Sequence, residues 1–168
     1  KISSASFSAR YYPEGFIFDV AGCCYFPKSK LSKKFVVSFL NSKITAKLLE
    51  FLSPTLNFEI EQVKKLPFIQ ELDNDTKHLE AIFDIALNDW NSYETSWDFE
   101  KICLIRINSN KLESSFDAYR SHCQNMSEEM KQLEEENNKK FIDAYELQGE
   151  LTSDVSIEEI TLFANPKY

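Results

Sequence analysis

The sequence predicts an α+β fold that is mostly helical: a small antiparallel β-hairpin or sheet packed on a helix, followed by long helices. Three observations support this class. Only three glycines and five prolines occur in 168 residues, which favours long regular elements over a many-turned β fold. Short β-like stretches flank a Pro-Glu-Gly turn near the start of the chain. Apolar residues then recur at helical spacing through most of the remainder.

Residues 3–26 are expected to form the sheet. Residues 6–12 and 16–20 are the candidate strands. Pro13-Glu14-Gly15 is the turn between them, because proline pre-sets φ and glycine accepts a positive φ. Residues 23–26 extend the chain as a third short strand. An isolated hairpin is marginal in water, so this one is expected to lie on the following helix or to complete a larger sheet.

A strong amphipathic helix is predicted from Lys33 to Leu52, with Ser32 as its N-cap. Ser53-Pro54 ends it, because proline lacks an amide proton and crowds the preceding turn. Thr55 to Pro67 is then expected to be extended and partly paired. A core helix with a connecting strand is the plain interpretation of this pattern.

The second half of the chain is predicted to be helical. One helix is expected over 73–90, capped by Asp73 or Asp75. An aromatic loop over 91–99, pinned by Trp97 and Phe99, follows it.

A long helix is predicted from Lys111 to Leu151. Its apolar residues between 112 and 133 step alternately by four and three, which is a heptad seam typical of a coiled-coil-like spacer. So narrow a seam requires a partner helix, which could be the predicted 73–90 helix, another domain or another chain. Gly149 is predicted to end this helix or to allow a bend in it. Residues 152–168 are predicted to be a linker with one capped turn, in which Ser156 and Glu159 form a capping box.

Charge is distributed unevenly along the chain, which carries −8 in total. Residues 1–49 hold eight basic and two acidic side chains, a net charge of +6, and the remainder holds 11 basic and 25 acidic, a net of −14. The negative total charge opposes nonspecific nucleic-acid binding by the whole chain. The positive charge of residues 1–49 is what we expect if only these residues contact phosphate. A chance imbalance on solvated surfaces is the alternative.

Four lysines in residues 27–34 lead into the predicted helix. Lysines at a helix start oppose the helix dipole and cost about a few tenths of a kcal/mol each, so their presence suits an approaching phosphate backbone. A solvated loop is the alternative here.

Recognised catalytic motifs are absent from the sequence. It contains no glycine-rich phosphate loop, no Gly-x-Ser-x-Gly, no His-Glu-x-x-His and no Cys/His group with metal-ligand spacing, so neither a catalytic nor a metal site is predicted. No signal peptide or run of 18 apolar residues occurs, and unpaired cysteines suit a reducing cytosol, so a cytoplasmic protein with no membrane contact is expected. The chain begins with Lys and is expected to be a piece of a longer protein.

Several short motifs of this sequence, and the order in which they occur, resemble those of one protein family. They are FSAR at 7–10, GFIFDVAG at 15–22, FLNSK at 39–43, LSPTLNF at 52–58, DWNSYETSWDF at 89–99 and LQGELT at 147–152. This series resembles the PglX family, the adenine-specific DNA methyltransferases of BREX phage-defence systems. The long motif at residues 89–99 is specific to this family, whereas Leu-Asn-Ser-Lys occurs in many restriction–modification proteins. Cys23-Cys24 departs from the family pattern, which has small hydroxyl residues there.

The resemblance implies a piece downstream of the methyltransferase catalytic core. Residues 1–70 would close the target-recognition region, 71–151 would be a helical spacer and 152–168 a linker. The piece itself would be non-catalytic, without the catalytic Asn/Asp-Pro-Pro-Tyr/Phe word, and S-adenosylmethionine would belong to the parent enzyme. The implied partners are double-stranded DNA, the catalytic domain of the same parent chain, and a partner helix or defence-system protein. The predicted DNA contacts are Arg10, Lys28, Lys30, Lys33 and Lys34.

A second function remains open. The 112–133 seam would dock a partner subunit in a helical protein-interaction module, and the basic front would be incidental to that function.

Overall fold

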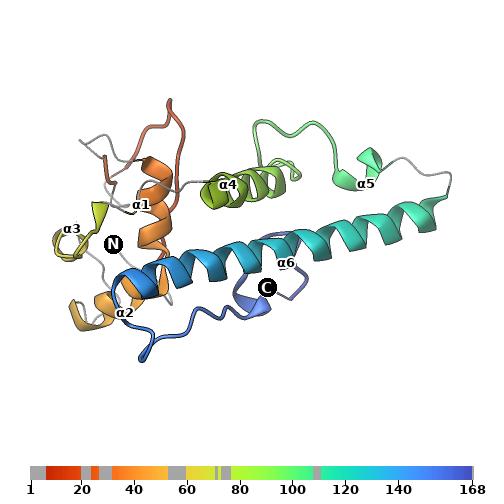
Figure 1. Ribbon diagram of the computed structural model, residues 1–168. Helices are drawn as coiled ribbons and strands as arrows, with labels where there is room; N and C mark the ends of the chain where they lie inside the picture. Colours follow the sequence, from red (N-terminus) through yellow and green to blue (C-terminus); the bar gives the residue numbers. More distant parts are fainter. Residues whose placement is uncertain are drawn as a thin grey trace. The chain divides into compact units, whose positions relative to one another are not determined.

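The computed structural model describes residues 7–19, 24–26, 32–52, 60–70, 72, 77–107 and 111–167. Within these residues the regular elements are all helices, and no strand occurs (Figure 1). The predicted α+β class is therefore wrong for the described chain, which is all-α. The helices are α1 (Lys33–Leu40), α2 (Lys43–Leu52), α3 (Ile60–Val63), α4 (Lys77–Trp90), α5 (Cys103–Arg106), α6 (Leu112–Ala144) and the 3₁₀ turn η2 (Ile157–Glu159).

The predicted hairpin keeps its turn but forms no strand ladder. Gly15 has a φ of +98°, as expected for the turn. The flanking residues pack through their rings instead: Tyr12 meets Phe16 at 5.2 Å and Phe18 at 5.5 Å between centroids, both edge to face. The aromatic residues that suggested strands therefore contact one another around the turn. A two-stranded ladder without further strands is marginal, which explains why ring packing replaces it.

The predicted helix from Lys33 to Leu52 is in fact two helices. Asn41 ends α1 and Ser42 precedes α2. Ser32 is the N-cap of α1, as predicted, and its Oγ accepts the Phe35 amide at 3.4 Å. The predicted stop at Ser53-Pro54 lies outside the described residues, although α2 ends at Leu52, immediately before it.

The extended segment predicted for residues 55–67 is wrong where it is described. Residues 60–63 form the short helix α3 and residues 64 and 65 continue it as a turn. Leu66 is buried after this turn. A helical turn satisfies these backbone groups locally, so no neighbouring strand is required.

The chain divides into two compact units. Unit 1 comprises residues 1–79 and 137–153, and unit 2 comprises residues 80–136 and 154–168. The predicted functional boundaries at 70 and 151 remain a prediction. None of the described helices combines the length and apolarity needed to cross a membrane.

Aromatic rings form the core of unit 1. Phe35 and Phe39 of α1 are buried against Phe141 of α6, with centroid distances of 5.7 and 5.5 Å. Phe68 meets both α1 rings edge to face, at 5.3 and 5.1 Å. Full burial of a phenylalanine side chain contributes about 1.5–3 kcal/mol, so this cluster fixes α1 on the last turns of α6.

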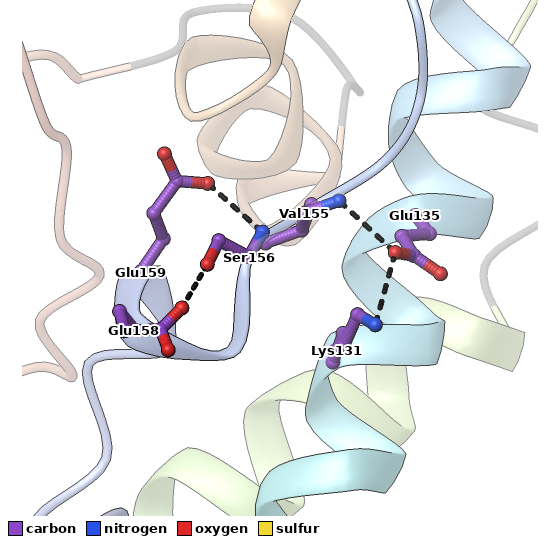
Figure 2. Close-up of polar contacts among 6 residues, drawn as sticks. All are labelled: Lys131, Glu135, Val155, Ser156, Glu158 and Glu159. Atoms are coloured by element: carbon purple, nitrogen blue, oxygen red, sulfur yellow. Dashed lines mark hydrogen bonds and ion pairs between the residues drawn. The ribbon is translucent and has the colours of Figure 1, made fainter. Parts of the chain in front are cut away.

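The C-terminal residues of the chain build the core of unit 2. Val155, Ile160 and Leu162 are buried with Met130 of α6, and Ile82 and Ile85 of α4 pack against them. The C-terminal half of the heptad seam is therefore covered by this chain's own residues. The predicted capping box of Ser156 and Glu159 is present at η2, and Glu135 of α6 accepts the Val155 amide at 3.0 Å (Figure 2).

Helix α6 ends earlier than Gly149, the predicted stop. Glu146 takes a left-handed φ of 57° after the last turn. The Leu147 amide donates to the Ile142 carbonyl at 3.0 Å, and the Glu146 amide donates to the Asp143 carbonyl at 3.2 Å. These two bonds make a Schellman motif, which terminates a helix without requiring glycine, although a non-glycine residue in this conformation is strained.

Candidate nucleic-acid interface

Three of the five predicted DNA-contact residues belong to the described part of unit 1. They are Arg10, Lys33 and Lys34. Lys28 and Lys30 lie outside the described residues. The three are held around α1, although Arg10 and Lys33 are 23 positions apart in the sequence.

The N-terminus of α1 is electropositive. Its first turn carries Lys33 and Lys34 and no acidic side chain. Lys33 is exposed and Lys34 is partly buried. Two lysines add to the positive end of the helix dipole, so this end of α1 favours an anion.

Arg10 is held at the opposite end of α1. The side chain of Asn41, the C-cap residue, makes two hydrogen bonds with the backbone of Ala9: Oδ1 accepts the Ala9 amide at 2.8 Å and Nδ2 donates to the Ala9 carbonyl at 2.9 Å. This pairing imitates a strand contact with an amide side chain. It fixes the backbone next to Arg10 while the arginine side chain remains exposed.

The length of α1 sets the distance between the two basic ends. Eight helical steps separate Lys33 from Asn41, and at 1.5 Å per residue they span about 12 Å. The major groove of B-DNA is also about 12 Å wide. The two basic ends are thus spaced suitably for phosphates on either side of one groove.

The bend between α1 and α2 is built from hydroxyl side chains. The Phe39 carbonyl accepts both Ser42 Oγ and Thr45 Oγ1 at 2.7 Å. Ser42 Oγ in turn accepts the Thr45 amide at 3.3 Å, as an N-cap does. Ser42 and Thr45 are buried and the Asn41 side chain binds backbone, so these residues fix the packing of the bend.

Two adjacent asparagines of α6 hold this bend from the other side. Asn138 Oδ1 accepts the Lys43 amide at 2.9 Å, which satisfies the start of α2. Asn137 Nδ2 donates to the Ser38 carbonyl at 3.2 Å. Asn137 lies one four-residue step beyond Leu133, the last apolar residue of the heptad seam, and its contact with α1 was not predicted from the sequence. The available signal was the pair of amide residues, Asn137 and Asn138, where the seam would place an apolar residue.

Other lysines of unit 1 have acidic neighbours on their own helix. Lys47 pairs with Glu50 at 2.9 Å, and Lys64 pairs with Glu61 at 2.7 Å. Hydrogen bonding and charge from Lys64 lower the pKa of Glu61. These intrahelical pairs reduce the local positive charge around Lys47 and Lys64.

Unit 2 contains a pocket of about 530 Å³ between α4, α5 and α6. Tyr93, Tyr119 and Cys123 line it, and burial raises the pKa of all three groups. Their phenols and thiol are consequently neutral at physiological pH and are not activated as nucleophiles. No group of three potential metal ligands occurs among the residues that the model describes.

The sequence motif at residues 89–99 lines one side of this pocket, and its side chains have a structural function. Asp89 is buried, and its two carboxylate oxygens accept the amides of Phe163 and Ala164 at 2.8 and 2.9 Å. Ser96 Oγ donates to Asn91 Oδ1 at 2.6 Å, which closes the loop. The prediction that Trp97 pins the loop is wrong, since its side chain is 93% exposed.

A search against protein-family models matches none. Two characterised proteins are similar to the chain. It is 36% identical over 167 residues to the adenine-specific methyltransferase PglX of Lacticaseibacillus casei (strain Zhang), which covers 96% of this chain and 14% of that protein. It is also 36% identical over 128 residues to the adenine-specific methyltransferase BrxX of Escherichia coli O9:H4 (strain HS), covering 73% of this chain and 10% of that protein.

These similarities confirm the resemblance that the sequence motifs indicated. The chain is related to the PglX and BrxX adenine-specific methyltransferases over most of its length. The chain spans about one seventh (14%) of the length of the PglX relative. The activity of the whole relative therefore extends to this chain only as a proposal.

Proposed function

We propose that this chain, related to one segment of the PglX and BrxX methyltransferases, is a non-catalytic DNA-recognition and spacer piece of a site-specific N6-adenine DNA methyltransferase. In this proposal unit 1 grips duplex DNA, and the rest of the parent protein carries out methyl transfer. The observation that carries the proposal is the attachment of Arg10 and the lysine pair Lys33 and Lys34 to the two ends of one short helix.

Charge supports the choice of unit 1. It contains thirteen basic and eleven acidic residues, whereas unit 2 contains six basic and sixteen acidic residues. Duplex DNA is a dense line of negative charge and is repelled by an acidic surface. In this proposal the DNA therefore contacts unit 1, and the acidic side chains of unit 2 take no part in phosphate binding.

Each basic residue has a distinct task in this arrangement. Lys33 and Lys34 bind backbone phosphates, where a compact ammonium is sufficient and no base is read. Arg10 clamps a phosphate or donates to a guanine edge in the major groove, which arginine does with two hydrogen bonds. Asn41 and Asn138 position these groups by holding the bend between α1 and α2.

The experiment is a measurement of duplex affinity at several salt concentrations, by fluorescence anisotropy. Lys33→Ala and Lys34→Ala together are expected to reduce the slope of log K against log salt by about 0.9 for each phosphate that is no longer neutralised, and so by up to about 1.8. Lys101→Ala with Arg120→Ala in unit 2 is the matched control and leaves the slope unchanged. A slope that is equal in the Lys33/Lys34 variant and the wild type would contradict the proposal.

The resemblance to adenine-specific methyltransferases implies S-adenosylmethionine for the parent enzyme. The sequence contains neither the glycine-rich loop nor the Asn/Asp-Pro-Pro-Tyr/Phe motif expected of the catalytic part. We assign no cofactor-binding residue to this chain and place the cofactor on the catalytic part of the parent.

A second candidate function is protein docking through the start of α6. Leu112 is 76% and Phe116 50% exposed at this end of the seam, which favours a partner there. Sedimentation of the chain with Leu112→Asp and Phe116→Asp tests it. A concentration-dependent assembly that these changes abolish would support docking. Met130→Asp is not a suitable variant, because Met130 is a core residue of unit 2 and its replacement is expected to unfold that unit.

A further inference from the structure

The pocket of unit 2 has the size and the lining of a small-molecule site. Its volume is about 530 Å³, and protein sites for small molecules enclose about 300–1,000 Å³. Ile102, Leu104 and Met126 contribute apolar surface, and the rings of Tyr93 and Tyr119 contribute aromatic surface. Every lining residue belongs to unit 2, so the pocket lies within one compact unit.

A buried carboxylate without a cationic partner lies at this pocket. Asp89 lines the pocket, and only 4% of the residue is exposed. Burial raises the pKa of its carboxyl group, whereas the amides of Phe163 and Ala164, which donate to its two oxygens, lower the pKa and favour the ionised form. No lysine or arginine among the described residues pairs with Asp89. Buried charges in proteins are normally paired, so this carboxylate lacks the compensation that a cation supplies.

The phenols and the thiol of the pocket are neutral. Hydrogen bonds link the Tyr119 phenol to the Tyr93 phenol and to the Cys123 thiol. Burial is the main cause of the raised pKa of Tyr93, and the negative charge of Asp89 is the second cause. The charge of Asp89 therefore acts inside the pocket, where these groups do not cancel it.

The remaining charged side chains of the lining also favour a cation. Glu94 is a second carboxylate, exposed to solvent, and no lysine or arginine lines the pocket. Of the lining residues only His122 can carry a positive charge, and it is exposed. Tyrosine rings attract cations through the negative charge of their faces. An anionic ligand would meet two carboxylates, and a neutral ligand would leave the charge of Asp89 uncompensated.

We propose that this pocket binds a small organic cation, an ammonium group attached to an aliphatic or aromatic body. The ammonium compensates the carboxylate of Asp89 and interacts with the rings of Tyr93 and Tyr119. The body of the ligand fills the apolar part of the pocket, where it is removed from water. This site lies in unit 2 and is independent of DNA binding by unit 1.

The test uses the full 168-residue chain and three probes of similar shape: 2-phenylethylammonium, the neutral 2-phenylethanol and the anionic 3-phenylpropanoate. Each is titrated into the isotopically labelled protein, and shifts of the backbone amide signals are followed by NMR. We expect the cation to shift the signals of residues 92–95, 102–104 and 119–126, and to bind about tenfold more tightly than the alcohol. The anion should bind most weakly.

Glu94→Gln removes the exposed carboxylate of the lining and should weaken binding of the cation about threefold while leaving the alcohol unaffected. Glu128→Gln is the matched control, since Glu128 is an exposed glutamate of α6 that does not line the pocket, and it should behave as the wild type. Equal affinities for the cation and the alcohol would overturn the assignment of a cation. Shifts confined to residues outside the pocket, or no binding of any probe, would overturn the site itself.

Discussion

Glu134 on α6 carries a carboxylate whose environment opposes ionisation. Burial in unit 2, and then the nearby charge of Glu159, raise its pKa from the ordinary value of 4.5 to about 7. We predict that Glu134→Gln stabilises unit 2 at pH 8 and has little effect at pH 5. Glutamine keeps the shape of the side chain and removes the charge.

The magnitude follows from the shift in pKa. A difference between 4.5 and about 7, at about 1.4 kcal/mol for each pKa unit, gives at most about 3.5 kcal/mol. The side chain is only partly buried, so water screens part of this energy, and we expect about 1–2 kcal/mol.

The direction of the pH dependence follows from proton binding. Below the unfolded pKa of 4.5 both states hold the proton, and above about 7 neither does. Between these values the folded state holds more protons than the unfolded state, so this group reduces stability as the pH rises. The Gln variant is free of this destabilisation, and its advantage over the wild type therefore grows between pH 5 and pH 8.

Urea denaturation followed by tryptophan fluorescence measures the effect in the correct unit, because both tryptophans, Trp90 and Trp97, belong to unit 2. Glu135→Gln is the matched control on the next residue. Glu135 accepts the Val155 amide at 3.0 Å and lies 3.7 Å from the Lys131 ammonium (Figure 2). Its replacement should destabilise unit 2 at both pH values.

A Glu134→Gln variant that is only as stable as the wild type at pH 8 would refute the reasoning. So would a gain of the same size at pH 5 and pH 8, because that gain would not arise from ionisation.

Three further predictions concern the hydrogen bonds that hold each unit. Asp89→Ala removes the acceptor of two backbone amides and should destabilise unit 2 by about 2–3 kcal/mol, measured by urea denaturation with tryptophan fluorescence; unchanged stability would argue against this anchor. Asn138→Ala leaves the Lys43 amide without its acceptor and should cost about 1–2 kcal/mol, seen as faster hydrogen exchange in the first turn of α2; equal exchange rates would contradict it. Glu146→Gly relieves a left-handed φ and should stabilise the fold by about 0.5–1 kcal/mol in a thermal melt, whereas a lower melting temperature would be inconsistent with the strain.

Local patterns in the sequence predicted most of the helices correctly. Periodicity located α4 and the long α6, and capping chemistry identified Ser32 and the Ser156–Glu159 box. These features depend on residues within one or two turns of each other. They are therefore visible without knowledge of the tertiary fold.

The errors arose where distant residues decide the local structure. The split between α1 and α2 depends on Asn138, which lies 95 positions from the Lys43 amide that it caps. The hairpin prediction followed β-like residues whose rings pack on Tyr12 instead of joining a sheet. The heptad seam predicted a partner helix. Its second half packs instead mainly on residues 155–162, which were predicted to be a linker, together with Ile82 and Ile85 of the predicted 73–90 helix.

The candidate site was predictable in composition and not in geometry. The lysine cluster and Arg10 are evident as charges in the sequence. Their attachment to the two ends of α1 depends on the hydrogen bonds of Asn41 with Ala9, a contact across 32 positions that no local pattern specifies.

Hydrogen exchange of the chain with and without a duplex tests the central claim most directly, since it locates the DNA on one unit. The account predicts that DNA slows exchange in residues 7–19 and in α1, and leaves exchange in residues 112–136 of α6 unchanged. Protection of residues 112–136 with no change around α1 would contradict it.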